Sequence, residues 1–204
     1  MDIQFRTLQR KDYKKAIQFA VDGMHFGIYF DHNFMAYLYG KYFLYSEMLQ
    51  ATQAIAAYHR EELAGLLISR VKREKPCFHS PAKALYVKTV ELIQRLFFQS
   101  SAGEYDTACR EMLAEYRASH SPDGEIIFLA ADPGCAIKGI GTRLLKEYEK
   151  REPGRLIYLY TDDQCTYQFY EHRGFQKMCE RNIVLSLKDC ISLKCMLYSK
   201  RIAQ

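Results

Sequence analysis

The chain has 204 residues, of which 49% are hydrophobic, and its formal net charge is +5. A chain of this length can bury a substantial core as one domain, and no apolar run approaches the roughly 20 residues that a membrane-spanning helix needs. The seven cysteines form no C-x-x-C pair, which excludes a complete disulfide framework and predicts no zinc or other metal site.

The scattered lysines and arginines predict no nucleic-acid surface, although the mild positive charge suits an anionic ligand. The first residues, MDIQFRTLQRKD, match neither a signal peptide nor an amphipathic presequence. We therefore expect a cytoplasmic protein that contacts no membrane.

The first seventy residues predict a short strand, two helices and a hairpin. IQFRTL reads as the strand, and residues 12–23 as a helix with apolar positions at Ala16, Ile17, Phe19 and Ala20. Residues 33–48 predict a second helix rich in Tyr and Phe. The run AIAAYHREELAGLLIS predicts a hairpin, because two apolar stretches flank a charged turn at residues 59–62.

Residues 72–124 are too apolar for a linker and predict an insertion of two helices joined by the turn SSAG. The apolar positions of the first helix are Leu85, Leu92, Ile93 and Leu96, and those of the second are Cys109, Met112, Leu113 and Tyr116. We expect the insertion to pack on the domain or to form a subunit contact, such as that of a homodimer.

The segment EIIFLAADPGCAIKGIGTRLLKEYEK, residues 125–150, predicts a buried strand, a sharp loop and an amphipathic helix. Asp132 and Pro133 end the strand, and two glycines open the helix. The inward face of that helix carries Ile140, Leu144, Leu145 and Tyr148. The first N–H groups of a helix lack internal partners and lie at the positive end of its dipole, so this segment predicts an anion site.

Two common phosphate-binding loops do not fit these residues. Gly134 and Gly139 have Walker A spacing, but Ile140 and Gly141 stand where that motif needs Lys and Ser or Thr. The dinucleotide fingerprint needs a third glycine where Leu144 stands.

The segment LIYLYTDDQCTYQFYEHRGF, residues 156–175, predicts a buried strand and a short helix. Asp162 or Asp163 is expected to cap this helix, Gly174 to end it in a left-handed conformation, and Phe175 to return to the core. Residues 183–187 and 193–198 predict two closing strands around a turn at residues 188–190.

Two motifs within residues 125–175 together resemble the GNAT superfamily of N-acetyltransferases. Its first motif is Gln or Arg, two residues, Gly, any residue, and Gly or Ala, at the start of the helix that binds the coenzyme A pyrophosphate; here it reads AIKGIG. Ala136 replaces the usual Gln or Arg, which removes one side-chain contact. The second motif is matched by FYEHRGF, residues 169–175, although Asp163 stands where Asn is frequent. The resemblance is looser over the first seventy residues and absent from the insertion.

The resemblance implies an α/β (α+β) GNAT fold. Its central sheet is mixed and mostly antiparallel, with a splayed parallel strand pair, and helices flank it. We expect a single acetyltransferase domain over residues 1–204, with the two-helix insertion at residues 72–124.

The resemblance also implies acetyl-CoA as cosubstrate and an amine as acceptor. The pantetheine arm is expected along the backbone of Leu129, Ala130 and Ala131, where the N–H of Leu129 or Ala130 would hold the oxyanion. The pyrophosphate cradle would be formed by the amides of Ile137, Lys138, Gly139, Ile140, Gly141 and Thr142. We place Cys165 among the cofactor contacts as a capping-turn thiol, because no Cys–His arrangement for an acetyl-cysteine can be read from the spacing.

Acid and base roles follow from the same resemblance. Tyr170 stands at the family's tyrosine position and would protonate the departing thiolate. Only about one lysine-like amine in a thousand is neutral at pH 7, so a base should matter. Glu125 lies fourteen residues before Gly139, the spacing of the base in the histone-acetylating branch. A solvated strand end is the plain alternative for Glu125, and His25, His32 and Asp162 are other candidate bases.

The resulting prediction is an N-acetyltransferase that acts on a primary amine of a small molecule or protein, by direct attack in a ternary complex. Residues 26–45 are expected to line the acceptor side. The alternative is a non-catalytic acetyl-CoA-binding regulatory or interaction protein, which Ala136 motivates.

Overall fold

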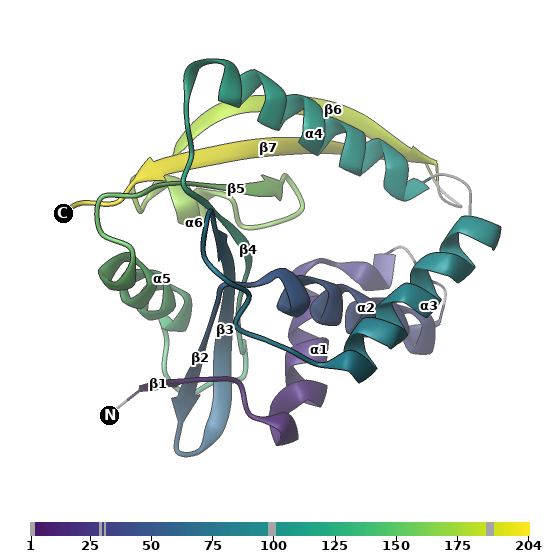
Figure 1. Cartoon of the computed structure of the whole chain (residues 1–204), viewed down its shortest axis with the longest axis horizontal. Helices are drawn as coiled ribbons and strands as arrows, with labels where there is room; N and C mark the ends of the chain where they lie inside the picture. The colour runs from purple at the N-terminus through teal and green to yellow at the C-terminus, as the bar shows by residue number, and fades with distance from the viewer. Residues whose placement is uncertain (1–2, 29, 31, 98–100, 187–189) are drawn as a thin grey trace. The chain divides into compact units, whose positions relative to one another are not determined.

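The computed structural model describes residues 3–28, 30, 32–97, 101–186 and 190–204 (Figure 1). The chain forms two compact units. The first contains Met1–Glu91 and Ile126–Pro153, and the second contains Leu92–Glu125 and Gly154–Gln204. A single domain over residues 1–204 stays a prediction.

The strands of the first unit pair in the order β1-β2-β3-β4. They are β1 (Gln4–Arg6), β2 (Gln53–His59), β3 (Glu62–Val71) and residues 126–131 of β4 (Gly124–Ala131). The β2–β3 hairpin confirms the predicted one. Its two central residues, Arg60 and Glu61, have positive φ angles of 47° and 67°, as the tight turns that match strand twist require.

Two long helices belong to this unit, α1 (Tyr13–Gly23) and α2 (Asn33–Gln50). The short 3-10 helices η1 (Arg10–Asp12) and η2 (Phe26–Ile28) precede them. A Cβ atom added to Gly40 would lie 2.6 Å from Val21 Cγ2, so glycine lets α2 approach α1 closely.

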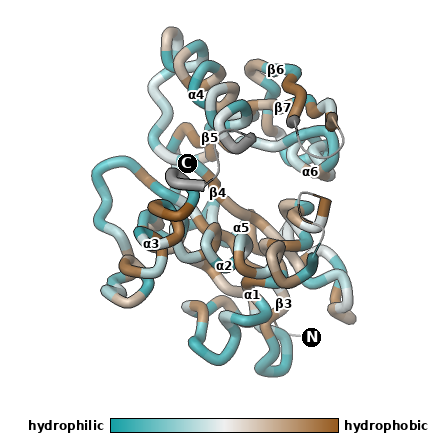
Figure 2. The backbone as a smooth tube through the Cα atoms, turned by 90° about the vertical axis from the view of Figure 1, so that its right-hand side faces the viewer, coloured by the Kyte–Doolittle hydropathy of each residue, from teal (hydrophilic) through white to brown (hydrophobic). Residues whose placement is uncertain are grey.

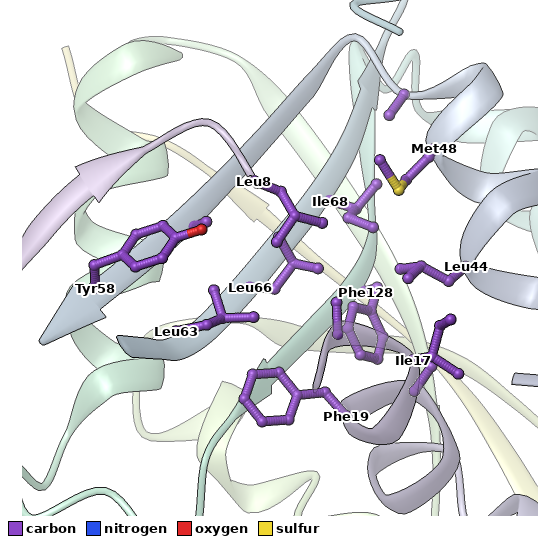
Figure 3. Packing of buried hydrophobic residues seen from close by; sticks show 14 residues of the cluster. Leu8, Ile17, Phe19, Leu44, Met48, Tyr58, Leu63, Leu66, Ile68 and Phe128 are labelled. Atoms are coloured by element: carbon purple, nitrogen blue, oxygen red, sulfur yellow. The ribbon is translucent and has the colours of Figure 1, made fainter. Parts of the chain in front are cut away.

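The core of the first unit lies between these helices and the strands (Figure 3). Ile17 and Phe19 from α1 and Leu44 and Met48 from α2 point toward β3 and β4, where Phe128 meets them. The predicted buried positions of α1 are confirmed, since Ala16, Ile17, Phe19 and Ala20 are all buried. The helix periodicity therefore identified the face that packs on the sheet.

The second unit pairs its strands in the order β4-β5-β7-β6. They are β5 (Leu156–Asp162), β6 (Gln176–Ser186), β7 (Cys190–Arg201) and the Gly124–Glu125 start of β4. The pairs Gly124↔Ile157 and Glu125↔Tyr158 are parallel, whereas β5–β7 and β6–β7 are antiparallel. The resulting mixed, mostly antiparallel sheet with one parallel pair and flanking helices confirms the predicted fold class.

The insertion forms two helices, α3 (Pro81–Phe97) and α4 (Ser101–Ser119). In Figure 1, α4 runs along β6 and β7. Its predicted inward residues Met112 and Tyr116 are buried, and the Tyr116 hydroxyl lies 2.6 Å from Ser199 Oγ. Helix α4 therefore packs on the sheet of its own unit.

One prediction about the insertion needs correction. The last three residues of the predicted SSAG turn belong to α4, which begins at Ser101, and Ser100 lies outside the described residues. Hydrophobic residues recur along α3 (Figure 2), and Leu85, Leu92 and Ile93 of its predicted apolar side are 68%, 57% and 45% exposed. The side chain of Leu96 lies outside the described residues. The buried side of α3 contains Val87 instead. A subunit contact by the insertion stays a prediction.

The closing strands extend further than predicted, since β6 begins at Gln176 and β7 ends at Arg201. Residues 188 and 189 of the predicted turn lie outside the described residues, and Cys190 already belongs to β7. The remaining helices are α5 (Ile140–Arg151) in the first unit and α6 (Gln168–Glu171) in the second.

Candidate active site

The predicted anion-binding helix α5 starts at the second residue of the motif's Gly-Ile-Gly. Its N-cap, Gly139, has a φ of +76°, and a Cβ atom added there would meet nothing within 4 Å. The first helical hydrogen bond runs from Arg143 N to Gly139 O at 3.0 Å. The amides of Ile140 and Gly141 precede that bond, so they lack a partner within the helix. Open space therefore adjoins a helix start that suits an anion.

The buried face of α5 is the predicted one, namely Ile140, Leu144, Leu145 and Tyr148. This face packs on β3 at Gly65, which sequence reasoning missed. A Cβ atom added to Gly65 would lie 2.7 Å from Ile140 Cγ2, and 2.9 Å from both Leu144 Cδ1 and the Ala130 carbonyl oxygen. A glycine inside a strand is the signal that could have found this close approach.

The link between β4 and α5 is organised by Asp132. Its Oδ1 accepts the Gly134 N–H at 2.8 Å, and its Oδ2 lies 2.6 Å from Lys15 Nζ of α1. Its backbone N–H donates to Ala64 O at 2.8 Å. The hydrogen bond from Lys15 is the largest cause that lowers the pKa of Asp132, so Asp132 is a carboxylate at neutral pH. Lys15 is the second residue that sequence reasoning missed.

The backbone residues predicted for the pantetheine arm, Leu129 to Ala131, end β4 in this first unit. The six predicted cradle residues follow in the same unit. Phe128 is buried in the core, and its neighbours Leu129 and Ala130 are half-buried while Ala131 is exposed. The structure thus brings the predicted cofactor-binding segments of β4 and α5 together in one unit.

Tyr170, Glu125 and Cys165 belong to the second unit. Tyr170 lies in α6, where its ring contacts Phe169 and Phe175 edge-on at centroid distances of 5.2 and 5.7 Å. Burial raises the pKa of Tyr170 well above its usual range, with a smaller contribution from Cys165. Its hydroxyl therefore stays protonated at neutral pH, as a proton donor needs.

The end of α6 confirms the predicted cap. Gly174 has a φ of +80°, and the Phe175 N–H donates to Tyr170 O at 3.1 Å. This bond satisfies a carbonyl of the last turn, and Phe175 is buried. The cap therefore fixes the backbone around Tyr170.

The predicted cap at the start of α6 is wrong. Asp162 Oδ1 accepts the N–H groups of Gln164 and Cys165 at 3.0 and 3.1 Å, so Asp162 caps the turn before the helix. Asp163 Oδ1 accepts the Lys194 N–H of β7 at 3.0 Å instead. Helix α6 is only four residues long, and its N-cap Tyr167 makes no side-chain capping bond.

Cys165 lies in that turn as predicted. Burial raises its pKa to about 12, with nearby Asp162 as the next cause. The side chain is therefore a thiol at neutral pH, which disfavours a covalent acetyl-cysteine because the thiolate is the nucleophile.

Glu125 lies at the start of β4, where its Oε2 accepts the hydroxyl of Tyr158 at 3.0 Å. The carboxylate is half-buried and has a defined partner. A freely solvated strand end therefore does not describe this residue. Its role as a base stays a prediction.

A hollow of about 460 Å³ lies between the end of α1, η2 and the start of α2. Its polar lining residues are Gln18, Asp22, His25, Asn33 and Tyr37. His25 has a φ of 53°, an uncommon conformation for a non-glycine residue that concentrates at functional sites. Two aromatic residues of the predicted acceptor lining, Phe26 and Phe43, are packed edge-on against each other at 5.6 Å instead.

Over the described ranges, no group of three or more His, Cys, Asp or Glu residues is placed to hold a metal ion. Among the helices of the same residues, none combines the length and hydrophobicity needed to cross a membrane.

The mixed sheet and the glycine-led start of α5 define a class of α/β protein that can hold an anionic ligand at a helix N-terminus. The model of the acetyltransferase (GNAT) family matches residues 19–175. The chain therefore belongs to the GNAT acetyltransferase family. A search of curated proteins found no match.

Solved structures share this fold. The PaiA N-acetyltransferase of Thermoplasma acidophilum, solved with coenzyme A, is 17% identical, with a TM-score of 0.56 over 98% of this chain and 99% of that chain. The polyamine N-acetyltransferase of Drosophila melanogaster is 15% identical, with a TM-score of 0.56 over 96% and 99%. The ribosomal-protein-S18-alanine N-acetyltransferase of Escherichia coli is 14% identical, with a TM-score of 0.55 over 100% and 96%.

Proposed function

We propose that this protein transfers an acetyl group from acetyl-CoA to a primary amine, by direct attack in a ternary complex. The observation that carries the proposal is the left-handed Gly139 at the start of α5, in a chain whose family model spans both motifs. The amine nitrogen forms a bond to the acetyl carbon and gives up one proton to a base, the carbon–sulfur bond breaks, and the thiolate accepts a proton.

The cofactor would be held mostly by backbone groups. The amides of residues 137–142 would bind the diphosphate, because glycine at position 139 leaves the backbone accessible. The backbone of residues 129–131 would bind the pantetheine arm. The N–H of Leu129 or Ala130 would stabilise the oxyanion, a contribution that is usually the largest in acyl transfer.

Proton transfer would involve two groups of the second unit. The protonated hydroxyl of Tyr170, whose pKa is raised by burial, suits the acid that protonates the thiolate. Glu125 suits the base because it is a half-buried carboxylate with a fixed hydrogen bond. Asp162 is a weaker candidate than Glu125, since its Oδ1 is engaged by two backbone N–H groups.

The hollow beside α1 and α2 supports a cationic acceptor. Asp22 is an acidic lining residue, and the described residues that line the hollow include neither Lys nor Arg. Gln18 donates to Asp22 Oδ1 at 2.8 Å, which orients the carboxylate. A small protonated amine would be attracted to this carboxylate before it loses its proton for reaction.

The proposal is tested by measuring coenzyme A release with a panel of polyamines, aminoglycosides, amino acids and lysine peptides. Tyr170→Phe should lower the turnover of any accepted amine by about 100-fold, the usual size of an acid–base contribution. Tyr198→Phe is the matched control, because its buried hydroxyl binds Glu171 at 2.7 Å. Equal losses in both variants would reject the acid role of Tyr170.

The same assay separates catalysis from the alternative function. Acetyl-CoA binding without turnover of any acceptor would favour a regulatory or interaction protein. Ala136, which lacks the side-chain contact of the usual Gln or Arg, is the residue that favours this alternative. If Asp22 guides a cationic acceptor, Asp22→Asn should raise the KM for amines and leave the affinity for coenzyme A unchanged.

A further inference from the structure

Lys15 and Asp132 connect α1 to the link that precedes the anion-binding helix. Lys15 Nζ lies 2.6 Å from Asp132 Oδ2, while Asp132 Oδ1 accepts the Gly134 N–H at 2.8 Å. The Asp132 carbonyl also accepts the Cys135 N–H at 3.2 Å. One carboxylate therefore ties the helix α1 to the first turn of the link.

The pair sits on well-packed neighbours within the first unit. On α1, Lys15 is flanked by the fully buried Ala16, and one turn later Phe19 is buried in the core. Asp132 directly follows β4, and its N–H donates to Ala64 O of β3 at 2.8 Å. The backbone of each residue is therefore held in place by its neighbours, and the two side chains bridge α1 and the link.

The chemistry of the pair favours a local role. The Lys15 and Asp132 side chains are 38% and 20% exposed, and ion pairs near the surface contribute little to global stability. A carboxylate can accept from Lys15 and Gly134 at once, because it has two oxygens and no proton. The pair can therefore order the link without dominating the stability of the fold.

We propose that Lys15 is a positioning residue for diphosphate binding, which acts through Asp132 rather than on the ligand. This inference rests on the proposed function. Asp132, held by Lys15, fixes the turn at Gly134 and thereby the approach of the chain to Gly139. The cradle amides are then ordered before the diphosphate binds, so less conformational entropy is lost on binding.

The competing explanation is that Lys15 neutralises the diphosphate directly. The two explanations predict opposite effects of Asp132→Asn. If Lys15 acts through Asp132, this change weakens coenzyme A binding. If Lys15 contacts the ligand, the change releases the ammonium group from its partner and binding stays equal or becomes tighter.

The experiment is calorimetric titration of coenzyme A into the wild type and five variants. Lys15→Met and Asp132→Asn should each weaken binding about fivefold, and the double variant should be no worse than either single variant. Lys15→Arg should retain affinity. Lys14→Met, an exposed neighbour on α1, is the charge-matched control and should leave affinity unchanged. Additive losses, or tighter binding by Asp132→Asn, would overturn the proposal.

Amide hydrogen exchange without any ligand gives an independent readout. Residues 132–139 should exchange faster in Lys15→Met and Asp132→Asn than in the wild type, while the thermal midpoint stays nearly the same. Unchanged exchange in both variants would reject the positioning role. If the wild type itself fails to bind coenzyme A, the proposed function fails, and the exchange result still decides whether the pair orders the link.

Discussion

Gly139 shows how one residue can set the geometry of a binding site. Its φ of +76° lies in the left-handed region, which a side chain makes unfavourable by about 1 kcal/mol. Because nothing lies within 4 Å of an added Cβ, this penalty would come from crowding within the local backbone and not from a clash with other residues. Glycine at this position therefore allows the left-handed backbone conformation, as the sequence motif predicts.

Replacing Gly139 with Val should weaken coenzyme A binding about tenfold, because the N-cap leaves its conformation and the side chain covers the amides. Lys138→Ala should have a much smaller effect, since the proposed cradle is made of backbone groups. Calorimetric titration checks both. Equal losses in the two variants would contradict a backbone cradle.

Tyr170 gives a prediction about pH. Because burial raises its pKa, the hydroxyl should remain protonated through the usual tyrosine value near 10. The turnover rate should therefore rise as the acceptor amine deprotonates and show no fall up to about pH 10. A rate profile measured from pH 7 to 10 tests this expectation. A decline there that disappears in Tyr170→Phe would show that Tyr170 ionises early.

At the scale of elements, the packing of α5 on β3 depends on Gly65. The Cβ of an alanine at this position would approach Ile140, Leu144 and the Ala130 carbonyl to 2.9 Å or less. Two of these atoms belong to α5 and one to β4, so the strand and the helix cannot both keep their places. The position links core packing directly to the proposed diphosphate site.

Gly65→Ala should lower the free energy of unfolding by about 1–3 kcal/mol through overpacking. It should also weaken coenzyme A binding, because α5 is displaced. Urea denaturation and calorimetric titration measure the two effects. The control is Gly103→Ala in α4, whose added Cβ meets nothing within 4 Å and should stabilise slightly. A neutral Gly65→Ala would contradict the close-packing account.

At the scale of the whole molecule, we expect buried and half-buried tyrosines to set the alkaline limit of stability. Burial is the largest cause that raises the pKa of Tyr58, Tyr105, Tyr116, Tyr160, Tyr170 and Tyr198. In the unfolded chain these groups ionise near pH 10. Above that pH the unfolded state binds fewer protons than the folded state, so stability falls as pH rises.

The urea midpoint should therefore drop steeply between pH 10 and 12. Tyr58, whose pKa is raised to about 12, gives the sharpest test. Tyr58→Phe removes the bond to Asp12 Oδ2 at 2.8 Å and should cost about 1 kcal/mol at pH 8. The deficit should shrink at pH 11, where the wild type loses the contribution of this group. A constant deficit would contradict the assignment.

The local signals predicted most of the elements, because helix periodicity, strand runs and glycine punctuation act over a few residues. The buried faces of α1 and α5 and the cap at Gly174 follow from such signals. The predicted N-terminal cap of α6 was wrong, because Asp162 caps the preceding turn and Asp163 accepts a hydrogen bond from the neighbouring strand β7. The exposure of the apolar side of α3 could not be predicted either, because periodicity identifies an apolar side without showing what covers it.

The sequence by itself determined the order of the elements, the family motifs and the glycine that precedes α5 as its N-cap, since each depends on neighbouring residues. Only the tertiary structure decided that Lys15 reaches Asp132, that Gly65 admits α5, and that Glu125 accepts from Tyr158. These contacts join residues far apart along the chain. Their partners are set by how strands and helices pack, which no local pattern specifies.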